Sequence, residues 1–247
     1  MHRIRATSAL DHAPFSRALL DGDTPEAARL LLGARLVRGS GVRARVGRIV
    51  EVEAYVGQED LASHARFGPT KRNAVMFGPA GLAYVYLVYG MHHCLNVVTE
   101  QPGRPGALLV RAVEPLVGAD EMRRARLEWL AARSSRTAVR GTAAQRARLE
   151  LARLRIAALD DASLASGPGL VCAAFSIGRS DHGTDLCEAD SDLRLEGEIQ
   201  DGTWSIQTGP RVGIGYAPEP WLSKPWRYWI AGNAAVSRTV NPRGQAG

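Results

Sequence analysis

Two carboxylates, Glu51 and Glu53, stand two residues apart in a stretch whose side chains alternate in polarity, and Tyr55 continues the alternation. In a β-strand such residues share a face, and at a rise of about 3.3 Å per residue the two carboxylates lie roughly 7 Å apart. That separation suits the acid and the base of an inverting glycosidase that acts on sugars. It also suits two solvated side chains on an exposed strand face, and the spacing does not choose between these alternatives.

Aromatic side chains gather near these carboxylates. Four of the six tyrosines lie between residues 55 and 89, namely Tyr55, Tyr84, Tyr86 and Tyr89. Tyrosines on strands commonly pack in a core. Beside a carboxylate, however, a flat aromatic platform suits a pocket that stacks a nucleobase and then acts on it. His64 and Asn96 add polar groups that can read a base edge, although a single histidine is more often structural than catalytic.

The charge balance favours a phosphate-rich partner. The 247 residues include 31 Lys and Arg against 25 Asp and Glu, a net charge of +6, which fits nucleic-acid binding as well as a generally cationic protein. No apolar run reaches the roughly 18 residues of a membrane helix, so we expect a soluble, cytoplasmic protein without a membrane partner. The cysteines match neither a disulfide framework nor a zinc site, and we expect mostly buried free thiols at Cys94, Cys172 and Cys187.

Helix and strand signals indicate how these residues are positioned. Thr24 as the N-cap and Pro25 at the first helical position start a helix that Gly33 stops. Residues 166–168 open a further short helix. Alternating and β-branched runs predict strands at residues 42–56, 83–89, 94–99, 107–114, 212–216 and 226–231. Short strands with irregular connections and helices grouped at the edges favour an α+β fold with a mainly antiparallel sheet.

Residues 118–160 differ in character from the rest of the chain. Alanine, leucine and arginine recur there at helical spacing, with a break near Gly141, and this pattern predicts two helices. The segment holds ten arginines against five acidic residues. We expect most of these arginines on solvated helix faces and some on a surface that meets a phosphate backbone.

A series of short blocks follows in order along the chain, at residues 49–55, 59–60, 63–64, 72–73, 76–77, 84–86, 89–91, 94, 96, 109–115, 166–168, 211–215 and 224–227. This series resembles the alkyladenine DNA glycosylase family, the 3-methyladenine DNA glycosylases of the animal and bacterial type. The resemblance implies a single compact domain over residues 1–247, with an ordered core at about 14–240 and a curved sheet flanked by helices. Residues 119–162 match poorly and are expected to form a helical insertion.

The resemblance also implies catalytic roles. Glu53 is expected to be the general base that deprotonates the attacking water. Arg111 and the backbone carbonyl of Val236 are expected to help hold that water. Glu51 has no catalytic role in this interpretation, in contrast to the paired-carboxylate hypothesis.

Base-binding roles follow from the same resemblance. Tyr55 is expected to stack on one face of the extruded base, and Tyr86 and His64 on the other. Asn96 is expected to crowd the position where guanine bears its exocyclic amine. Tyr89 is expected to intercalate into the duplex and fill the gap that the flipped nucleotide leaves.

The implied function is base-excision repair of damaged DNA. The enzyme would flip alkylated or deaminated purines out of double-stranded DNA and hydrolyse the N-glycosidic bond, with no metal and no organic cofactor. A monofunctional DNA-3-methyladenine glycosylase is expected, because neither Lys71 nor Lys224 falls where it could form a Schiff base. The resemblance further implies a monomer that works at the bacterial nucleoid or, in a eukaryote, in the nucleus. It does not rank 3-methyladenine, 7-methylguanine, hypoxanthine and ethenoadenine as substrates.

Two other hypotheses stay open from the residues themselves. A catalytically silent nucleic-acid-binding protein on the same scaffold accounts equally well for the basic charge. A carbohydrate hydrolase that uses Glu51 and Glu53 predicts a long cleft lined by tryptophan. Against that hypothesis, four of the five tryptophans stand at residues 204–229, far along the chain from the carboxylates.

Overall fold

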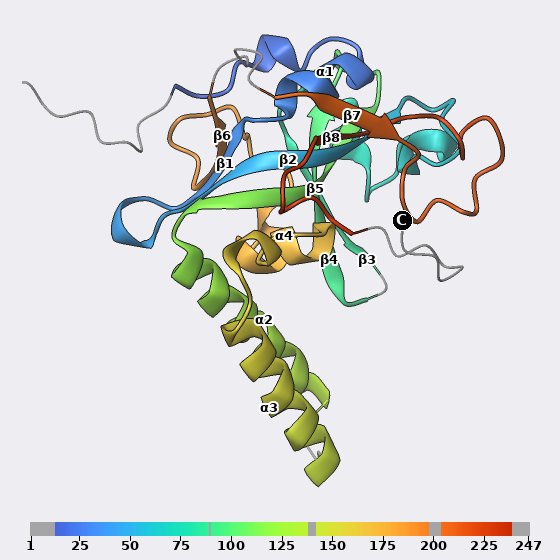
Figure 1. Cartoon of the computed structure of the whole chain (residues 1–247). Coiled ribbons are helices and arrows are strands. Elements are labelled where there is room, and N and C mark those ends of the chain that lie inside the picture. The colour runs from blue at the N-terminus through green and yellow to red at the C-terminus, as the bar shows by residue number, and fades with distance from the viewer. Residues whose placement is uncertain (1–12, 89, 138–141, 198–203, 239–247) are drawn as a thin grey trace, which may run out of the picture.

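The computed structural model describes residues 13–88, 90–137, 142–197 and 204–238, and it confirms the predicted α+β class (Figure 1). The strands are β1 (Arg35–Arg38), β2 (Arg45–Val56), β3 (Ala83–Val88), β4 (His92–Thr99), β5 (Gly106–Val117), β6 (Leu193–Glu196), β7 (Ile206–Gly209) and β8 (Arg227–Ile230). The α-helices are α1 (Thr24–Leu31), α2 (Ala119–Thr137), α3 (Ala143–Ala157) and α4 (Pro168–Ala174). Every pairing between these strands is antiparallel, and together they form one curved sheet.

Strand β2 holds the sheet together. The strand order is β3-β4-β5-β2-β1-β6, and β8 also pairs with β2 and carries β7 on its outer edge. Along one edge of β2, β1 pairs with Arg45–Arg48, whereas β8 pairs with Glu51–Glu53. Because β5 pairs along the other edge, Glu51 and Glu53 have a strand on each side. The two carboxylates therefore lie in the interior of the sheet and not at its rim.

The pairing of β2 with β5 shifts register twice next to Glu51. One shift leaves Val50 extra on β2, and the other leaves Arg111 extra on β5. A bulge releases a residue from the regular ladder and re-aims it relative to its neighbours. The carbonyl of Arg111 accepts a hydrogen bond from the Gly167 N–H at 2.9 Å, in the turn that starts α4. The predicted turn before α4 thus fixes the bulge that carries Arg111.

The start of α1 differs by one residue from the prediction. Asp23, not Thr24, is the N-cap, and its carboxylate accepts a hydrogen bond from the Glu26 N–H at 3.2 Å. Aspartate is at least as good a cap as threonine. The Thr24 hydroxyl is buried and instead donates to the Glu100 carboxylate at 2.7 Å. This bond ties the helix start to the end of β4.

The predicted strand at residues 212–216 is wrong, because this segment is a loop of turns. Val212 gives its N–H to the Glu53 carboxylate at 2.6 Å and not to a neighbouring strand. Gly213 has a φ of +78°, which lies outside the strand region. Three short strands, β1, β6 and β7, were not predicted.

The core lies on both sides of the sheet. Helix α1 covers one side and α4 the other (Figure 1), and both contribute to one buried cluster with residues of β2 and β5.

Two cysteines, Cys94 and Cys172, are buried free thiols and Cys187 is half-buried, as predicted. The two helices predicted between residues 118 and 160 are confirmed as α2 and α3, which project away from the sheet. Among the described helices none combines the length and the apolar character that a bilayer crossing requires.

Candidate active site

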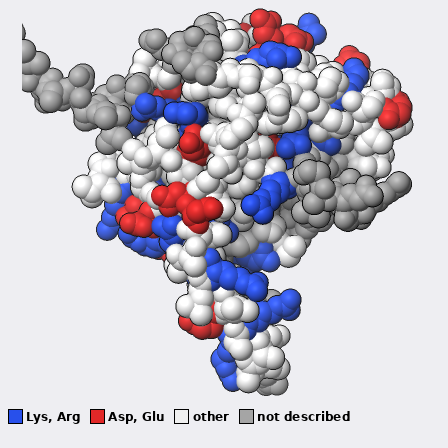
Figure 2. Space-filling model, in the orientation of Figure 1, with Lys and Arg blue, Asp and Glu red and all other residues white. Residues whose placement is uncertain are grey.

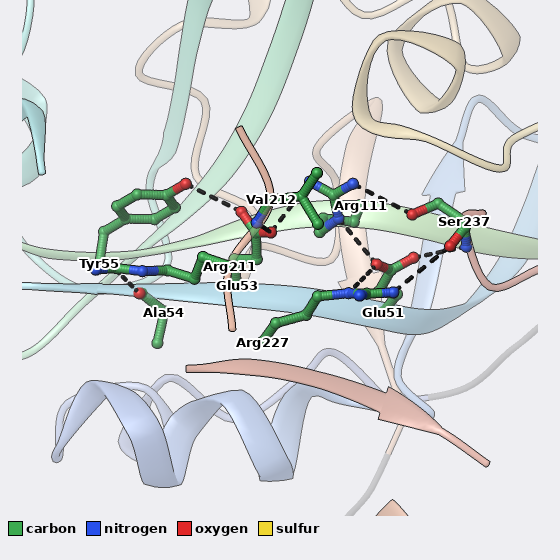
Figure 3. A network of polar contacts seen from close by, with 9 residues as sticks. All are labelled: Glu51, Glu53, Ala54, Tyr55, Arg111, Arg211, Val212, Arg227 and Ser237. Carbon is green, nitrogen blue, oxygen red and sulfur yellow. Dashed lines mark hydrogen bonds and ion pairs between the residues drawn. The ribbon is translucent and has the colours of Figure 1, made fainter. Parts of the chain in front are cut away.

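The two carboxylates of β2 are completely buried. Glu51 and Glu53 each have 0% exposure, so the alternative of a solvated strand face is wrong. A carboxylate removed from water is stable only when hydrogen-bond donors and positive charge replace the water. Figure 3 shows how four other segments of the chain supply those partners.

Glu51 has donors on both of its oxygens. Its Oε1 accepts hydrogen bonds from Arg111 Nε at 2.9 Å and from Arg227 Nε at 2.7 Å. Its Oε2 accepts from the Ser237 N–H at 2.7 Å. Because these three bonds tie Glu51 to Arg111, Arg227 and Ser237, Glu51 is suited to hold Arg111 and the segment around residue 237 in place (Figure 3).

Glu53 accepts two hydrogen bonds from the described residues, one fewer than Glu51. Its Oε1 accepts from the Val212 N–H and lies 3.1 Å from Arg111 Nη1. Among the described residues, its Oε2 accepts one hydrogen bond, from the Tyr55 hydroxyl at 3.0 Å. Burial raises the pKa of the Glu53 carboxyl above 4.5, although Arg111, the Val212 N–H and the Tyr55 hydroxyl oppose this rise. A carboxylate with a raised pKa and a free lone pair suits a general base.

Arg111 stands between the two acids. Besides its contacts with Glu51 and Glu53, its Nη2 donates to the Ser237 hydroxyl at 3.2 Å. Burial disfavours its positive charge, but the two carboxylates outweigh burial and raise the Arg111 pKa. The guanidinium is therefore a fixed positive charge beside Glu53.

A buried ion pair supports Tyr55 from behind. Arg211 and Asp60 both have 0% side-chain exposure, and Arg211 Nη2 lies 2.9 Å from the Asp60 Oδ1. The Arg211 guanidinium lies 4.7 Å from the centre of the Tyr55 ring and 5.0 Å from the centre of the Trp226 ring. Asp60 also accepts the backbone N–H of Val56, directly after Tyr55. The pair thus fixes both the ring and the backbone at the end of β2.

Four residues expected to bind a base line one pocket. Its wall includes Tyr55, His64, Tyr86 and Asn96, together with Ala62, Ser63, Met76, Tyr84, Ala107 and Tyr216. The pocket and Glu53 meet at Tyr55, whose ring lines the pocket and whose hydroxyl donates to the carboxylate. Aromatic rings and a few polar groups are the lining that a flipped base requires.

Hydrogen bonds hold the polar groups of the pocket. Asn96 is buried, and its Nδ2 donates to the carbonyl of Tyr84 at 3.0 Å, so its position is fixed. His64 Nδ1 lies 3.0 Å from the Tyr84 hydroxyl. Desolvation and the nearby cations Arg72 and Arg66 lower the pKa of His64 to about 4. The imidazole is therefore neutral at physiological pH.

A second, larger hollow adjoins the pocket across Tyr86. Its volume is about 580 Å³, and its lining residues are Lys71, Arg72, Val85, Tyr86, Leu87, His93, Arg179 and His182. Arg72 lies 5.4 Å from the centre of the Tyr86 ring. Three of these residues carry a positive charge, so the hollow suits a phosphate group next to a base held in the pocket.

The remaining predicted residues are Val236, Tyr89 and the two lysines. Val236 lies next to Ser237, whose N–H binds Glu51 and whose hydroxyl binds Arg111, so the segment that carries the Val236 carbonyl is anchored beside the acids. Tyr89, the predicted intercalating residue, lies outside the described residues, and its role stays a prediction. Neither lysine of the chain lines the base pocket.

Three partners of the acids were not predicted from the sequence: Val212, Arg227 and Ser237. The pair of Asp60 with Arg211, which supports Tyr55, was not predicted either. Asp60 and the segments 211–215 and 224–227 belong to blocks of the resemblance, but their residue types gave no indication of a role. The tryptophans at residues 204–229 are far from the carboxylates along the chain but not all are far in the fold, because β8 pairs Trp229 with Glu51. The pocket wall nevertheless contains no tryptophan. Within the described residues, no cluster of three metal-ligating side chains occurs.

Known proteins are similar in sequence to this chain over most of its length. Residues 18–234 match the family model described as methylpurine-DNA glycosylase (MPG). A protein of Anaeromyxobacter sp. (strain Fw109-5) is 42% identical over 225 residues, which cover 91% of this chain and 92% of the relative. One of Methanocella arvoryzae is 41% identical over 224 residues, which cover 90% of this chain and 94% of the relative. Both carry the name "Putative 3-methyladenine DNA glycosylase".

Proposed function

This chain belongs to the methylpurine-DNA glycosylase family, and on that premise we propose that it flips damaged purines out of duplex DNA and hydrolyses their N-glycosidic bond. The observation that carries the proposal is the connection between the buried Glu53 and the aromatic pocket through the Tyr55 hydroxyl. A base in that pocket has its sugar near the carboxylate that can activate a water.

In the proposed reaction, Glu53 accepts a proton from water as the water oxygen bonds to the C1′ carbon of the sugar. The bond between C1′ and the base nitrogen breaks, and the base leaves with its electron pair. Arg111 orients Glu53 through the contact at 3.1 Å, and the Val236 carbonyl is proposed to accept a hydrogen bond from the same water. An alkylated purine leaves readily because it is electron-poor, so one general base can suffice.

The pocket is proposed to select the base by stacking and by exclusion. Tyr55 packs on one face of the base, and Tyr86 and His64 on the other. Many alkylated purines carry a positive charge, and a neutral His64 avoids repelling them, which agrees with its lowered pKa of about 4. Asn96 occupies a fixed position where the exocyclic amine of guanine would enter.

The proposed product is an intact abasic site. Strand cleavage by a lyase requires an amine that forms a Schiff base with the sugar. The chain contains two lysines, of which Lys71 lines the adjacent hollow and Lys224 Nζ lies 4.1 Å from the Trp226 ring centre and 4.4 Å from that of Trp221. Neither lysine lines the base pocket itself, which supports a monofunctional enzyme.

The other hypotheses fit the geometry less well. A carbohydrate hydrolase needs Glu51 as a second acid or base, but three donors engage its oxygens. A catalytically silent binding protein gives no reason for a buried carboxylate that keeps one lone pair free beside the pocket. That hypothesis remains the alternative which the next experiment tests.

Duplexes that each carry one 3-methyladenine, 7-methylguanine, hypoxanthine or ethenoadenine test the proposal. We expect the protein to release at least one of these bases faster than it releases any undamaged base. Chromatographic measurement of the free base provides the rate. Tight binding of every duplex without release of any base would favour the silent binding protein.

Acid is expected to inhibit base release, with a midpoint above pH 4.5. Burial raises the pKa of Glu53, and below this pKa the protonated carboxyl cannot accept a proton from water. The rate is therefore full above the raised pKa and falls as the pH drops through it. Single-turnover rates at several pH values, corrected for base loss without enzyme, measure the profile. A rate that holds down to pH 4.5 would contradict the assignment.

Asn96→Ala is expected to raise the release of guanine relative to adenine-derived lesions by several-fold. The buried amide of Asn96 is held by the Tyr84 carbonyl, so its removal opens space that only guanine's amine needs. The rates of base release from guanine-containing and lesion-containing duplexes, measured in competition, give the ratio of guanine release to lesion release. An unchanged ratio in a variant that folds normally would show that Asn96 does not exclude guanine.

A further inference from the structure

Helices α2 and α3 form an arm that leaves the body of the protein (Figure 1), and we call residues 119–157 the helical arm. At its root, Met122 and Ala125 are buried, and Arg126 donates to two backbone carbonyls at residues 163–164. On α3, Ile156 is the one buried residue of the described helix. Helices that bury so little apolar surface contribute little to a core. The arm therefore adds little to the stability of the fold, and its length points to a role outside the core.

The outer helix of the arm presents basic side chains. Arg146, Arg148, Arg153 and Arg155 are all exposed, and Glu150 is the only acidic residue of α3. Arg153 pairs with Glu150 at 3.5 Å. Arg148 and Arg155 form no ion pair with any residue that the structure describes, and two helical turns, or about 10 Å, separate them on one side of the helix. Figure 2 shows Lys and Arg side chains along the visible face of the arm.

The second half of α2 contacts the hairpin of β3 and β4. His92 stacks on Trp129 of α2, with 5.0 Å between the ring centres, and Arg133 Nη2 donates to the Met91 sulfur at 3.2 Å. The same hairpin supplies Tyr86 to the base pocket. The arm and the hairpin extend from the sheet in the same direction (Figure 1). The hairpin that lines the base pocket is therefore in direct contact with the arm.

We propose that the helical arm binds phosphates of the duplex that flanks the damaged base. This inference rests on the proposed function, because that function brings duplex DNA to the hairpin. The 19 residues of α2 span about 28 Å, and B-DNA carries one charge per 1.7 Å of axis, so a duplex of that length presents roughly 16 phosphates. Arginines on a rigid helix bind phosphates without reading sequence. The arm lengthens the DNA footprint on one side of the pocket.

The test compares two double variants that remove the same charge. Arg148→Gln with Arg155→Gln changes the arm, and Arg29→Gln with Arg104→Gln changes α1 and the loop after β4, at the opposite end of the molecule. The probes are undamaged duplexes of about 30 and about 10 base pairs. For the arm variant we expect roughly tenfold weaker binding of the long duplex at low salt. The slope of the logarithm of the binding constant against the logarithm of the salt concentration should also be smaller in magnitude by about 1–2, since each phosphate contact contributes about 0.9 to that slope. The short duplex and the control variant should show neither change.

Equal affinity and equal salt slope for the wild type and the arm variant would overturn the proposal, and so would an equal loss in the control variant. A changed sedimentation coefficient with unchanged DNA affinity would assign the arm to contacts between copies of the chain through Leu151 and Leu154, and would also overturn it. These readouts use undamaged DNA and need no base release. A wild type that binds through the arm and releases no base contradicts the proposed function alone.

Discussion

Glu53→Gln is expected to lower the single-turnover rate of base release by about 10²–10⁴-fold, because an amide cannot take a proton from water. The fold should survive the change. Arg111 keeps its contact with Glu51 at 2.9 Å, so the arginine charge stays paired. Affinity for a damaged duplex should also persist, since phosphate contacts and the aromatic pocket supply it. Rapid-quench measurement of free base and a binding isotherm on the same duplex separate the two effects.

Glu196→Gln is the matched control for this variant. Glu196 is also buried and also pairs with an arginine, Arg194 at 2.7 Å, but it lies on the outer strand β6. Its replacement should leave the rate of base release unchanged. A comparable loss of rate in both variants would mean that the loss in Glu53→Gln reflects disturbed folding. An unchanged rate of base release in Glu53→Gln would show that Glu53 is not the general base.

Asp60→Asn is expected to lower the free energy of unfolding by about 3 kcal/mol or more, since it leaves the buried Arg211 guanidinium without its counter-charge. The segment that follows Tyr55 should loosen at the same time, because Asp60 also accepts hydrogen bonds from the N–H groups of Val56 and Ala62. Urea unfolding with an unchanged slope measures the difference in stability.

Asp120→Asn supplies the comparison for this change. Asp120 pairs with Arg123 at 3.0 Å, but its side chain is 96% exposed. Water and salt screen such a pair, so the same substitution should have almost no effect on stability. If Asp60→Asn destabilises the protein no more than Asp120→Asn does, the buried pair does not hold the wall of the base pocket.

The sequence predicts those parts of the site that depend on local pattern. The alternation through β2 places Glu51, Glu53 and Tyr55 on one strand, and the helical spacing between residues 118 and 160 predicts α2 and α3. The strand-like runs at residues 83–89 and 94–99 likewise predict the strands that carry Tyr86 and Asn96. Each of these features repeats within a few residues, so it is visible without knowledge of the tertiary structure.

Other parts of the site depend on contacts between distant segments. The bulge that aims Arg111 arises from the pairing of β2 with β5 and from the bond to Gly167, and no local pattern marks it. Val212 looks like a strand residue, but its N–H binds Glu53 because a buried carboxylate needs donors. Short strands such as β1 and the edge strand β6 form because a neighbouring strand offers hydrogen-bond partners, which propensity alone does not reveal.

Hydrolytic release of the base without strand cleavage is tested most directly by analysing both products from an end-labelled duplex with a single alkylated purine, using wild-type protein in excess. We predict release of the free base and a labelled strand that stays full-length until hot alkali cleaves it at the abasic site. A duplex that is bound but keeps its base, or a strand that is cut before alkali is added, would contradict this mechanism.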